Sequence, residues 1–251
     1  MPDQNAQISL LGNRAENQDQ VKVVEADGVV LLMAIDGMGG HANGARAAEM
    51  AVEIIEKAFL EQKHPVFDPQ GFLHLAIGRA HAAVVELGSE HSVETRPRAT
   101  CALCLIQEGT AYWGHVGDSR IYHLRGANVY ERTRDHSHVE ALLYDGAITQ
   151  DELATHPMRN YVECCLGGDA ELPRMSISGQ KSLQQGDVML VCSDGFWGPL
   201  EELQLADLGV ANGSLATHLQ TLGEMATRIA APHSDNTSAA AFSFRSAGRL
   251  N

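Results

Sequence analysis

The chain has 251 residues, of which 44% are hydrophobic and 20% are charged, a balance that excludes an intrinsically disordered protein. Its net charge of -14, from 18 Lys and Arg against 32 Asp and Glu, argues against a nucleic-acid-binding protein, which needs an excess of cations. The longest apolar run, 29–35, is too short to span a membrane and no secretory signal precedes it, so we expect a cytoplasmic protein without membrane contact.

The first part of the chain predicts a hairpin followed by two helices. Strand-like runs at 20–26 and 29–35 are joined by Asp27-Gly28, a dipeptide typical of tight hairpin turns. Apolar residues then recur at helical spacing between 43 and 61. Asp68-Pro69 has the pattern of an N-cap followed by a first-turn proline, so a second helix is expected to begin there.

The remainder of the chain is richer in strands. Four short strand-like runs separated by turn residues lie at 100–107, 110–116, 120–125 and 128–132. Because the turns between them are short, we expect successive members of this series to be antiparallel neighbours. Further strands are predicted at 174–178, 188–192 and 237–244, and helices at 139–144, 150–154, 200–208 and 215–230. Hairpins with helices grouped in blocks predict an α+β fold, in which antiparallel sheets are covered by helices, as one domain over 1–251.

Two of the five cysteines have the CxxC spacing that is found in many zinc sites. Cys101 and Cys104, however, belong to a predicted strand, in which residues three apart point to opposite faces. We therefore favour buried, small hydrophobic side chains over a zinc site.

Aspartates recur where apolar strands begin or end. Asp36, Asp118 and Asp194 follow such runs, and Asp235 precedes the last one. If these carboxylates converge, their repulsion favours protonation or a bound cation, and carboxylate oxygens suit Mg²⁺ or Mn²⁺, with several of them suiting two ions. The alternative for each aspartate is an ordinary turn, because Asp-Gly is a common turn dipeptide.

Five motifs occur in a fixed order along the chain. They are RAENQD at 14–19, DGMGGH at 36–41, VGDSR at 116–120, SDGFW at 193–197 and Asp235-Asn236. In this order and spacing they closely resemble the metal-dependent Ser/Thr protein phosphatase family (PPM type), in particular its bacterial branch, over about residues 8–244. The resemblance implies a four-layer α-β-β-α sandwich of two antiparallel β-sheets flanked by helices. It also implies a flap subdomain at about 135–168 that borders the active site.

The resemblance also implies a binuclear Mn²⁺ or Mg²⁺ centre with a third, weaker ion. The implied ligands are Asp19, Asp36, Gly37, Asp118, Asp194 and Asp235. Asp36 would bridge the two main ions, Asp19 would act through a metal-bound water, and Asp118 would serve the third ion. None of these carboxylates is missing from the chain.

Two more residues complete the implied reaction. Arg14 would bind the substrate phosphate, because its planar guanidinium can contact two oxygens at once. His41 would be the general acid that protonates the departing Ser or Thr oxygen. A hydroxide bridging the two metal ions would attack phosphorus directly, without a covalent phospho-enzyme.

We therefore expect a monomeric, metal-dependent phosphatase that acts on phosphoserine and phosphothreonine in proteins, with a Ser/Thr kinase as its partner in signalling. One alternative is a catalytically silent regulator of the same fold that binds phosphoproteins, whose signature would be a lost metal carboxylate. A second is a two-metal hydrolase of phosphodiesters or nucleotides, against which the negative charge of the chain weighs when the substrate is a polynucleotide.

Overall fold

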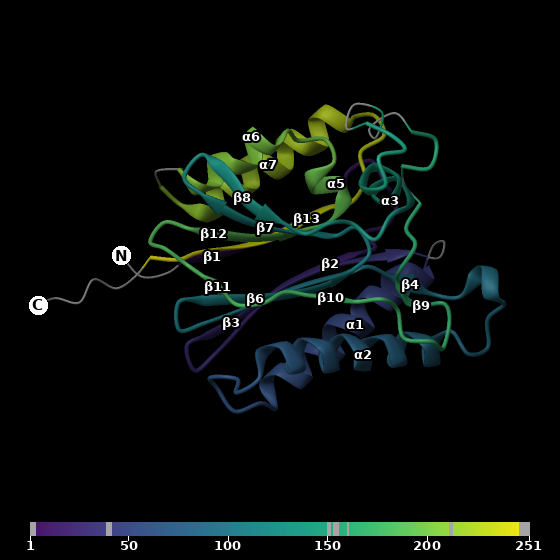
Figure 1. Ribbon diagram of the computed structural model, residues 1–251. Coiled ribbons are helices and arrows are strands. Elements are labelled where there is room, and N and C mark those ends of the chain that lie inside the picture. Colours follow the sequence, from purple (N-terminus) through teal and green to yellow (C-terminus); the bar gives the residue numbers. More distant parts are fainter. Residues whose placement is uncertain are drawn as a thin grey trace, which may run out of the picture.

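The computed structural model describes residues 4–38, 42–149, 152, 156–159, 161–210 and 213–245. Within them, two antiparallel sheets pack face to face, and helices cover both outer faces (Figure 1). The first sheet has the spatial order β1 (Gln4–Leu10), β13 (Thr237–Ser243), β12 (Val188–Cys192), β7 (Arg120–Arg125) and β8 (Asn128–Arg132). The second sheet has the order β10 (Ser176–Ile177), β6 (Thr110–Val116), β5 (Cys101–Gln107), β3 (Val29–Met38), β4 (Arg98–Ala99) and β9 (Leu166–Gly167). Two more strands join it: β2 (Asp19–Ala26) pairs with β3, and β11 (Lys181–Ser182) pairs with β6.

The helices lie in two groups on opposite sides of the sheets (Figure 1). The second sheet is covered by α1 (Ala42–Leu60) and α2 (Pro69–Leu87). The first is covered by α5 (Asp194–Trp197), α6 (Glu202–Ala206) and α7 (Leu215–Ala230). The remaining pieces are α3 (His138–Tyr144), η1 (Val93–Thr95) and η2 (Asp207–Gly209). The predicted four-layer α+β sandwich is confirmed, and no helix within the described ranges combines the length and apolar character needed to cross a bilayer.

Both faces of each central strand are buried, which explains the uninterrupted apolar runs in the sequence. Along β3, Leu31 and Met33 pack beneath α1 and α2, whereas Leu32 faces the other sheet. The same alternation separates the two cysteines of β5. Cys101 lies in the layer under the helices and Cys104 lies between the sheets, so their predicted burial on opposite faces is confirmed.

The local signals for turns and caps agree with the structure. Asp27 and Gly28 have φ of 47° and 79°, as a two-residue hairpin turn requires. Asp68 caps α2, since its Oδ1 accepts a hydrogen bond of 2.9 Å from the Gly71 backbone N–H. Helix α2 therefore begins at Pro69, where the sequence predicts.

One expectation about connectivity is wrong. We expected 110–116 and 120–125 to be antiparallel neighbours, but β6 and β7 lie in different sheets. The turn at Gly117 (φ 96°) and Asp118 carries the chain across the sandwich. A Cβ on Gly117 would lie 2.8 Å from Thr100 Cγ2, so only glycine fits this close crossing. A short connection excludes a parallel crossover, but it does not exclude a passage between layers.

Smaller differences have local causes. β3 continues to Met38 because its last two residues pair with β4. The strand β1 was not predicted, because only Ala6 and Ile8 of this edge strand are buried. The helix predicted at 150–154 lies, except for Glu152, outside the described residues.

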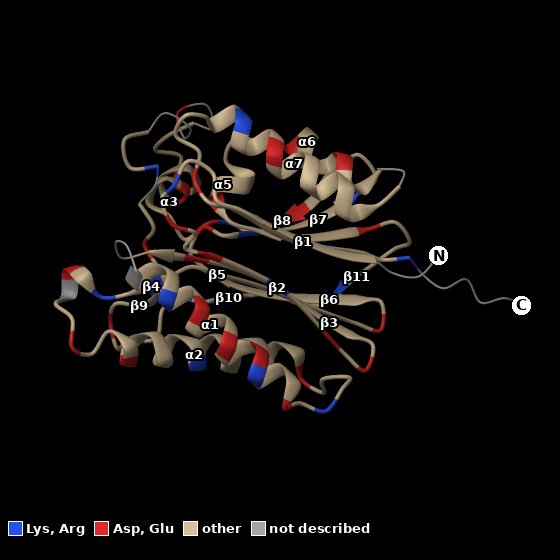
Figure 2. Ribbon diagram, turned by 180° about the vertical axis from the view of Figure 1, so that it is seen from behind, with Lys and Arg blue, Asp and Glu red and all other residues tan. Residues whose placement is uncertain are grey.

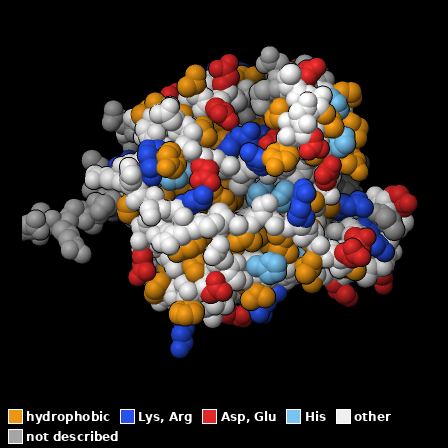
Figure 3. Space-filling view, viewed as in Figure 1, with side chains coloured by type: hydrophobic (Ala, Val, Ile, Leu, Met, Phe, Trp, Pro, Cys, Tyr) orange, Lys and Arg blue, Asp and Glu red, His pale blue; other side chains and the backbone are white. Residues whose placement is uncertain are grey.

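An ion-pair cluster of Arg125, His123 and the buried Asp187 connects β7 to the turn before β12. Arg125 Nε and Nη2 donate to Oδ1 and Oδ2 of Asp187 at 2.8 and 2.7 Å, and His123 Nε2 lies 2.8 Å from the same Oδ2. The Arg125 guanidinium also stacks over the Tyr130 ring at 4.3 Å. On the face of the molecule that Figure 3 shows, basic side chains lie across the middle with acidic side chains beside them. Burial alone would raise the pKa of Asp187, but the hydrogen bonds from Arg125, Gln184 and His123 outweigh it and lower that pKa.

Replacing Asp187 with asparagine should lower the free energy of unfolding at neutral pH by about 3 kcal/mol, because Arg125 loses its buried counter-charge. Since the pKa of Asp187 is depressed in the folded state, its contribution is present at neutral pH and disappears as the pH falls through the folded pKa. The difference between variant and wild type should therefore shrink in acid. Urea denaturation at pH 7 and at acidic pH measures both effects, and equal midpoints at pH 7 would contradict the prediction.

Candidate active site

Strand pairing brings the predicted metal ligands to one end of the sandwich. Asp19 begins β2 and lies directly opposite Asp36 of β3 in the antiparallel pair. Asp194 begins α5, two residues after the end of β12, and Asp235 lies two residues before β13, the antiparallel neighbour of β12. Figure 2 shows acidic residues of both sheets at this end of the molecule. Residues more than two hundred positions apart in the chain thus become neighbours.

A cavity of about 490 Å³ opens among these residues. Its described lining consists of Arg14, Ala15, Glu16, Gln18, Asp36, Gly37, Met38, Asp118, Val162, Asp194, Asp235 and Asn236. The lining thus includes four of the predicted carboxylates, whereas Asp19 is buried and does not line the cavity. A larger hollow of about 740 Å³ lies between η2 and α7, but its described lining contains no Asp or Glu.

The carboxylates strongly influence one another. Burial, with the nearby carboxylates of Asp194 and Asp235, raises the pKa of Asp19 to about 7. Burial and the charge of Asp235 raise the pKa of Asp194 to about 6. The pKa values of Asp36 and Asp118 are also raised well above the ordinary value, first by burial and then by neighbouring carboxylates. Ionised carboxylates this close together repel one another when no cation is present. Hard divalent cations, which bind oxygen ligands, would stabilise them.

Arg14 is the one cation among the described lining residues, and it pairs with a carboxylate of the cluster. Its Nη2 lies 2.6 Å from Asp235 Oδ2. Asp19 Oδ2 accepts a hydrogen bond of 2.6 Å from Ser193 Oγ. No three Asp, Glu, His or Cys side chains in the described part of the chain converge as closely as the ligands of one ion do. The residues fit a divalent metal by donor type and charge, while Asp235 and Asp19 are directed at protein donors.

The predicted carbonyl ligand, Gly37, packs closely against a second glycine, Gly44. A Cβ on Gly37 would be 2.0 Å from the Gly44 carbonyl oxygen, and a Cβ on Gly44 would be 2.7 Å from the Gly37 carbonyl oxygen. The Gly37 N–H donates to the Gln18 carbonyl at 3.1 Å. Both glycines are therefore required for β3 to pass this close to the start of α1. His41, the predicted general acid, lies outside the described residues.

Asn236 organises the loop before β2, a role that the sequence did not predict. Its side chain is buried, and its Nδ2 donates to the carbonyls of Leu11 and Glu16 at 2.9 and 3.0 Å. Its Oδ1 accepts a hydrogen bond of 2.9 Å from the Gln18 N–H. The available signal was the amide directly after Asp235, because only an amide side chain both donates and accepts in this way.

Thr100 fixes the backbone of the central carboxylate and was also not predicted. Its N–H donates to the Asp36 carbonyl at 2.8 Å, and its Oγ1 accepts from the Asp36 N–H at 3.1 Å. The same hydroxyl lies 2.6 Å from Ser119 Oγ. Buried hydroxyl groups thereby connect the backbone of β3 at Asp36 to the turn before β7.

The segment predicted to be a flap borders the cavity. Val162 lines the cavity and forms an isolated β-bridge with Ser137. At its far end the segment returns to the second sheet, where Leu166–Gly167 forms β9 and pairs with β4. These contacts place Val162, from the second half of the segment, beside the carboxylates.

Comparison with known proteins is consistent with this arrangement. The family model described as protein phosphatase 2C matches residues 8–235. Protein phosphatase PhpP of Streptococcus pneumoniae is 30% identical over 223 residues, which cover 86% of this chain and 89% of PhpP. Serine/threonine protein phosphatase PstP of Mycobacterium tuberculosis is 31% identical over 202 residues, which cover 78% of this chain and 37% of PstP.

Solved structures share the fold over almost the whole chain. The serine/threonine phosphatase of S. agalactiae superimposes with a TM-score of 0.89 and 27% identity, covering 97% of this chain and 100% of that chain. The catalytic domain of PstP, solved in complex with two manganese ions, has a TM-score of 0.79 and 26% identity, with coverage of 96% and 97%. The family match spans more than half of the chain, and the protein therefore belongs to the protein phosphatase 2C family.

Proposed function

We propose that this protein hydrolyses phosphoserine and phosphothreonine in proteins and uses two divalent metal ions, Mn²⁺ or Mg²⁺, to do so. One observation carries the proposal: aspartates from four separate motifs line one cavity, and a fifth, Asp19, is buried directly opposite Asp36. Burial and the neighbouring carboxylates raise the pKa of Asp19, Asp36, Asp118 and Asp194. The relatives PhpP and PstP are phosphatases by name, and the PstP catalytic domain was solved with two manganese ions. The intact set of carboxylates favours an active enzyme over a silent regulator.

The residues proposed to hold the ions are those of the carboxylate cluster. They are Asp36, Gly37 through its carbonyl, Asp194 and Asp235, with Asp19 acting through water and Asp118 serving a third, weaker ion. When bound, the ions would supply positive charge and lower the pKa of a water molecule, the nucleophile of the reaction. A phosphomonoester with a charge of about -1.5 to -2 would otherwise be repelled by the carboxylates.

The other side chains bind the substrate and manage the proton. Arg14 reaches the cavity from the loop before β2, with its guanidinium partly exposed, so it can contact phosphate oxygens. Hydrolysis forms a bond between the oxygen of water and phosphorus and breaks the bond from phosphorus to the Ser or Thr oxygen. That oxygen leaves with a proton, and His41 remains our predicted donor.

The wider biological setting also belongs to the proposal. We propose one domain over residues 1–251, in which the flap at about 135–168 contributes to substrate choice because Val162 lines the cavity. A monomeric state, a cytoplasmic location and a partner Ser/Thr kinase remain predictions.

The proposal is tested by assaying the purified protein on p-nitrophenyl phosphate and on a phosphothreonine peptide. We expect activity with Mn²⁺ or Mg²⁺ and a fall to the background rate after EDTA, restored by excess Mn²⁺. Bis(p-nitrophenyl) phosphate, a diester, serves as the comparison substrate and should be cleaved far more slowly. Activity that survives EDTA would contradict the metal mechanism, and a preference for the diester would favour a two-metal phosphodiesterase.

A further inference from the structure

The turn that carries Asp118 is held from two sides. Trp197 of α5 donates its Nε1–H to the Asp118 carbonyl at 3.0 Å. On the other side, the His136 N–H donates to the Gly117 carbonyl at 2.9 Å, and the Gly117 N–H donates back to His136 Nδ1 at 3.3 Å. Helix α5 and the first residues of the flap therefore both fix the backbone that presents the Asp118 carboxylate.

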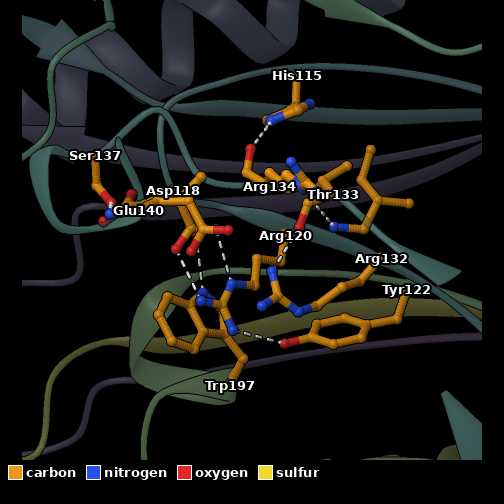
Figure 4. Close-up of polar contacts among 12 residues, drawn as sticks. His115, Asp118, Arg120, Tyr122, Arg132, Thr133, Arg134, Ser137, Glu140 and Trp197 are labelled. Atoms are coloured by element: carbon orange, nitrogen blue, oxygen red, sulfur yellow. Dashed lines mark hydrogen bonds and ion pairs between the residues drawn. The ribbon is translucent and has the colours of Figure 1, made fainter. Parts of the chain in front are cut away.

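A buried arginine connects these two supports. Arg120 Nε and Nη2 each donate to a carboxylate oxygen of Asp135 at 2.8 Å. The guanidinium lies 3.3 Å from the centroid of the Trp197 ring, and Nη1 donates to the Tyr122 hydroxyl at 3.1 Å. Figure 4 shows Arg120 stacked over Trp197, with Tyr122 at the edge of the guanidinium. The arginine thus contacts both the helix that begins with Asp194 and the residue that begins the flap.

The chemistry of this cluster needs arginine and tryptophan in particular. A planar guanidinium can bind a carboxylate with two parallel hydrogen bonds and stack on an aromatic face at the same time, whereas a lysine ammonium cannot. The Arg120 and Asp135 side chains are only 9% and 6% exposed, so water does not weaken the pair appreciably. Neither residue lines the cavity among the described residues, and nor does Trp197, so the cluster does not contact the reacting atoms directly.

We infer that Arg120 is a positioning residue, which acts through Trp197 and Asp135 to hold the Asp118 carboxylate toward the cavity and to tie the flap to α5. The inference rests on the proposed function, because it assigns Asp118 to the binding of a metal ion. Loss of the cluster should weaken the contribution of Asp118 to metal binding while leaving the other carboxylates in place. The expected result is a higher Mn²⁺ requirement with little change in the rate at saturating Mn²⁺.

The same strand supplies a matched control. Arg125, at the opposite end of β7, also binds an aspartate with two hydrogen bonds and also stacks on an aromatic ring. Its partners, Asp187 and Tyr130, are not in the described lining of the cavity. Arg125→Lys therefore disrupts a similar arginine–aspartate pair, in which Asp187 is buried and Arg125 is 25% exposed, without changing the turn at Asp118. Asp135 is left unchanged in the test, because its charge helps to raise the pKa of Asp118.

The test compares Arg120→Lys and Trp197→Phe with Arg125→Lys and wild type. Activity on p-nitrophenyl phosphate is measured over a range of Mn²⁺, and Mn²⁺ binding is measured by calorimetry without substrate. We expect the first two variants to need about tenfold more Mn²⁺ for half-maximal activity and to bind it correspondingly more weakly. The rate at saturating Mn²⁺ should stay within about twofold of wild type, since only positioning is lost.

Hydrogen exchange adds a readout that does not depend on catalysis. The amides at 117–119 and 136–138 should exchange faster in Arg120→Lys and Trp197→Phe than in Arg125→Lys. If all three variants lose stability alike while Mn²⁺ binding and its half-saturation stay at wild-type values, Arg120 has only a structural role and the inference is overturned. A wild-type protein that has no Mn²⁺-dependent activity would instead overturn the proposed function, so the two failures are distinguishable.

Discussion

Replacing Asp36 with asparagine should lower kcat/KM with Mn²⁺ by about a thousandfold or more, because the lost charge stabilisation amounts to several kcal/mol. Asp36 is partly buried and lines the cavity, where burial and the carboxylates of Asp19, Asp194, Asp118 and Asp235 raise its pKa. An amide there would lack the negative charge with which Asp36 is proposed to hold the cations. The change should therefore remove Mn²⁺-dependent hydrolysis of both p-nitrophenyl phosphate and a phosphothreonine peptide.

The same substitution should have the opposite effect on the metal-free protein. Removing one of several repelling carboxylates relieves an unfavourable interaction, so the melting temperature in EDTA should be equal to or higher than that of wild type. Mn²⁺ should raise the melting temperature of wild type, but should raise that of Asp36→Asn much less.

Asp27→Asn is the control for the Asp36 variant, since it changes the other end of the same hairpin. The Asp27 side chain is 84% exposed, and asparagine tolerates its positive φ. This control should retain activity and its response to Mn²⁺. Wild-type activity in Asp36→Asn would exclude Asp36 as a metal ligand.

Replacing Arg14 with alanine should lower kcat/KM on a phosphothreonine peptide by roughly 10- to 100-fold, the effect of losing charge-assisted hydrogen bonds to phosphate. Arg14→Lys should fall between alanine and wild type, because lysine keeps the charge but not the planar fork. The Mn²⁺ requirement should not rise, since the substitution frees Asp235 from its ion pair with Arg14. Steady-state kinetics at several Mn²⁺ concentrations separate the two effects.

Arg46→Ala provides the comparison for Arg14, because Arg46 lies on the exposed side of α1 and pairs only locally with Glu49. It should have the kinetics of wild type. A higher Mn²⁺ requirement in Arg14→Ala, with an unchanged KM for the peptide, would show that Arg14 supports the metal site and does not bind phosphate.

Much of the fold could be predicted because its signals are local. The runs at 120–125 and 188–192 match β7 and β12 residue for residue, and the stripe at 215–230 matches α7. Alternation in strands and the helical period depend only on which residues face the core, so a short window of sequence contains them. Edge strand β1 has too few buried residues for such a pattern, and it was not predicted.

Part of the candidate site could also be predicted from the sequence, but for a different reason. The aspartates stand in motifs whose order and spacing resemble a known family, so their convergence could be expected before any contact was known. The residues that hold them, such as Asn236 and Thr100, gave weaker signals, because their hydrogen bonds go to backbone groups far away in the sequence. A single polar residue carries no information about which distant carbonyl it will meet.

By itself, the sequence determined most element boundaries, since periodicity is a property of short segments, and the resemblance of its motifs to a known family implied the layers and the set of carboxylates. Only the tertiary structure decided that β6 and β7 belong to different sheets, and that the turn between them is held by Trp197 and His136. The physical reason is that the pairing of strands and the docking of side chains depend on surfaces that meet only when distant segments pack together. The stacking of Arg120 on Trp197 is such a contact, between residues that are distant in the sequence and adjacent in the fold.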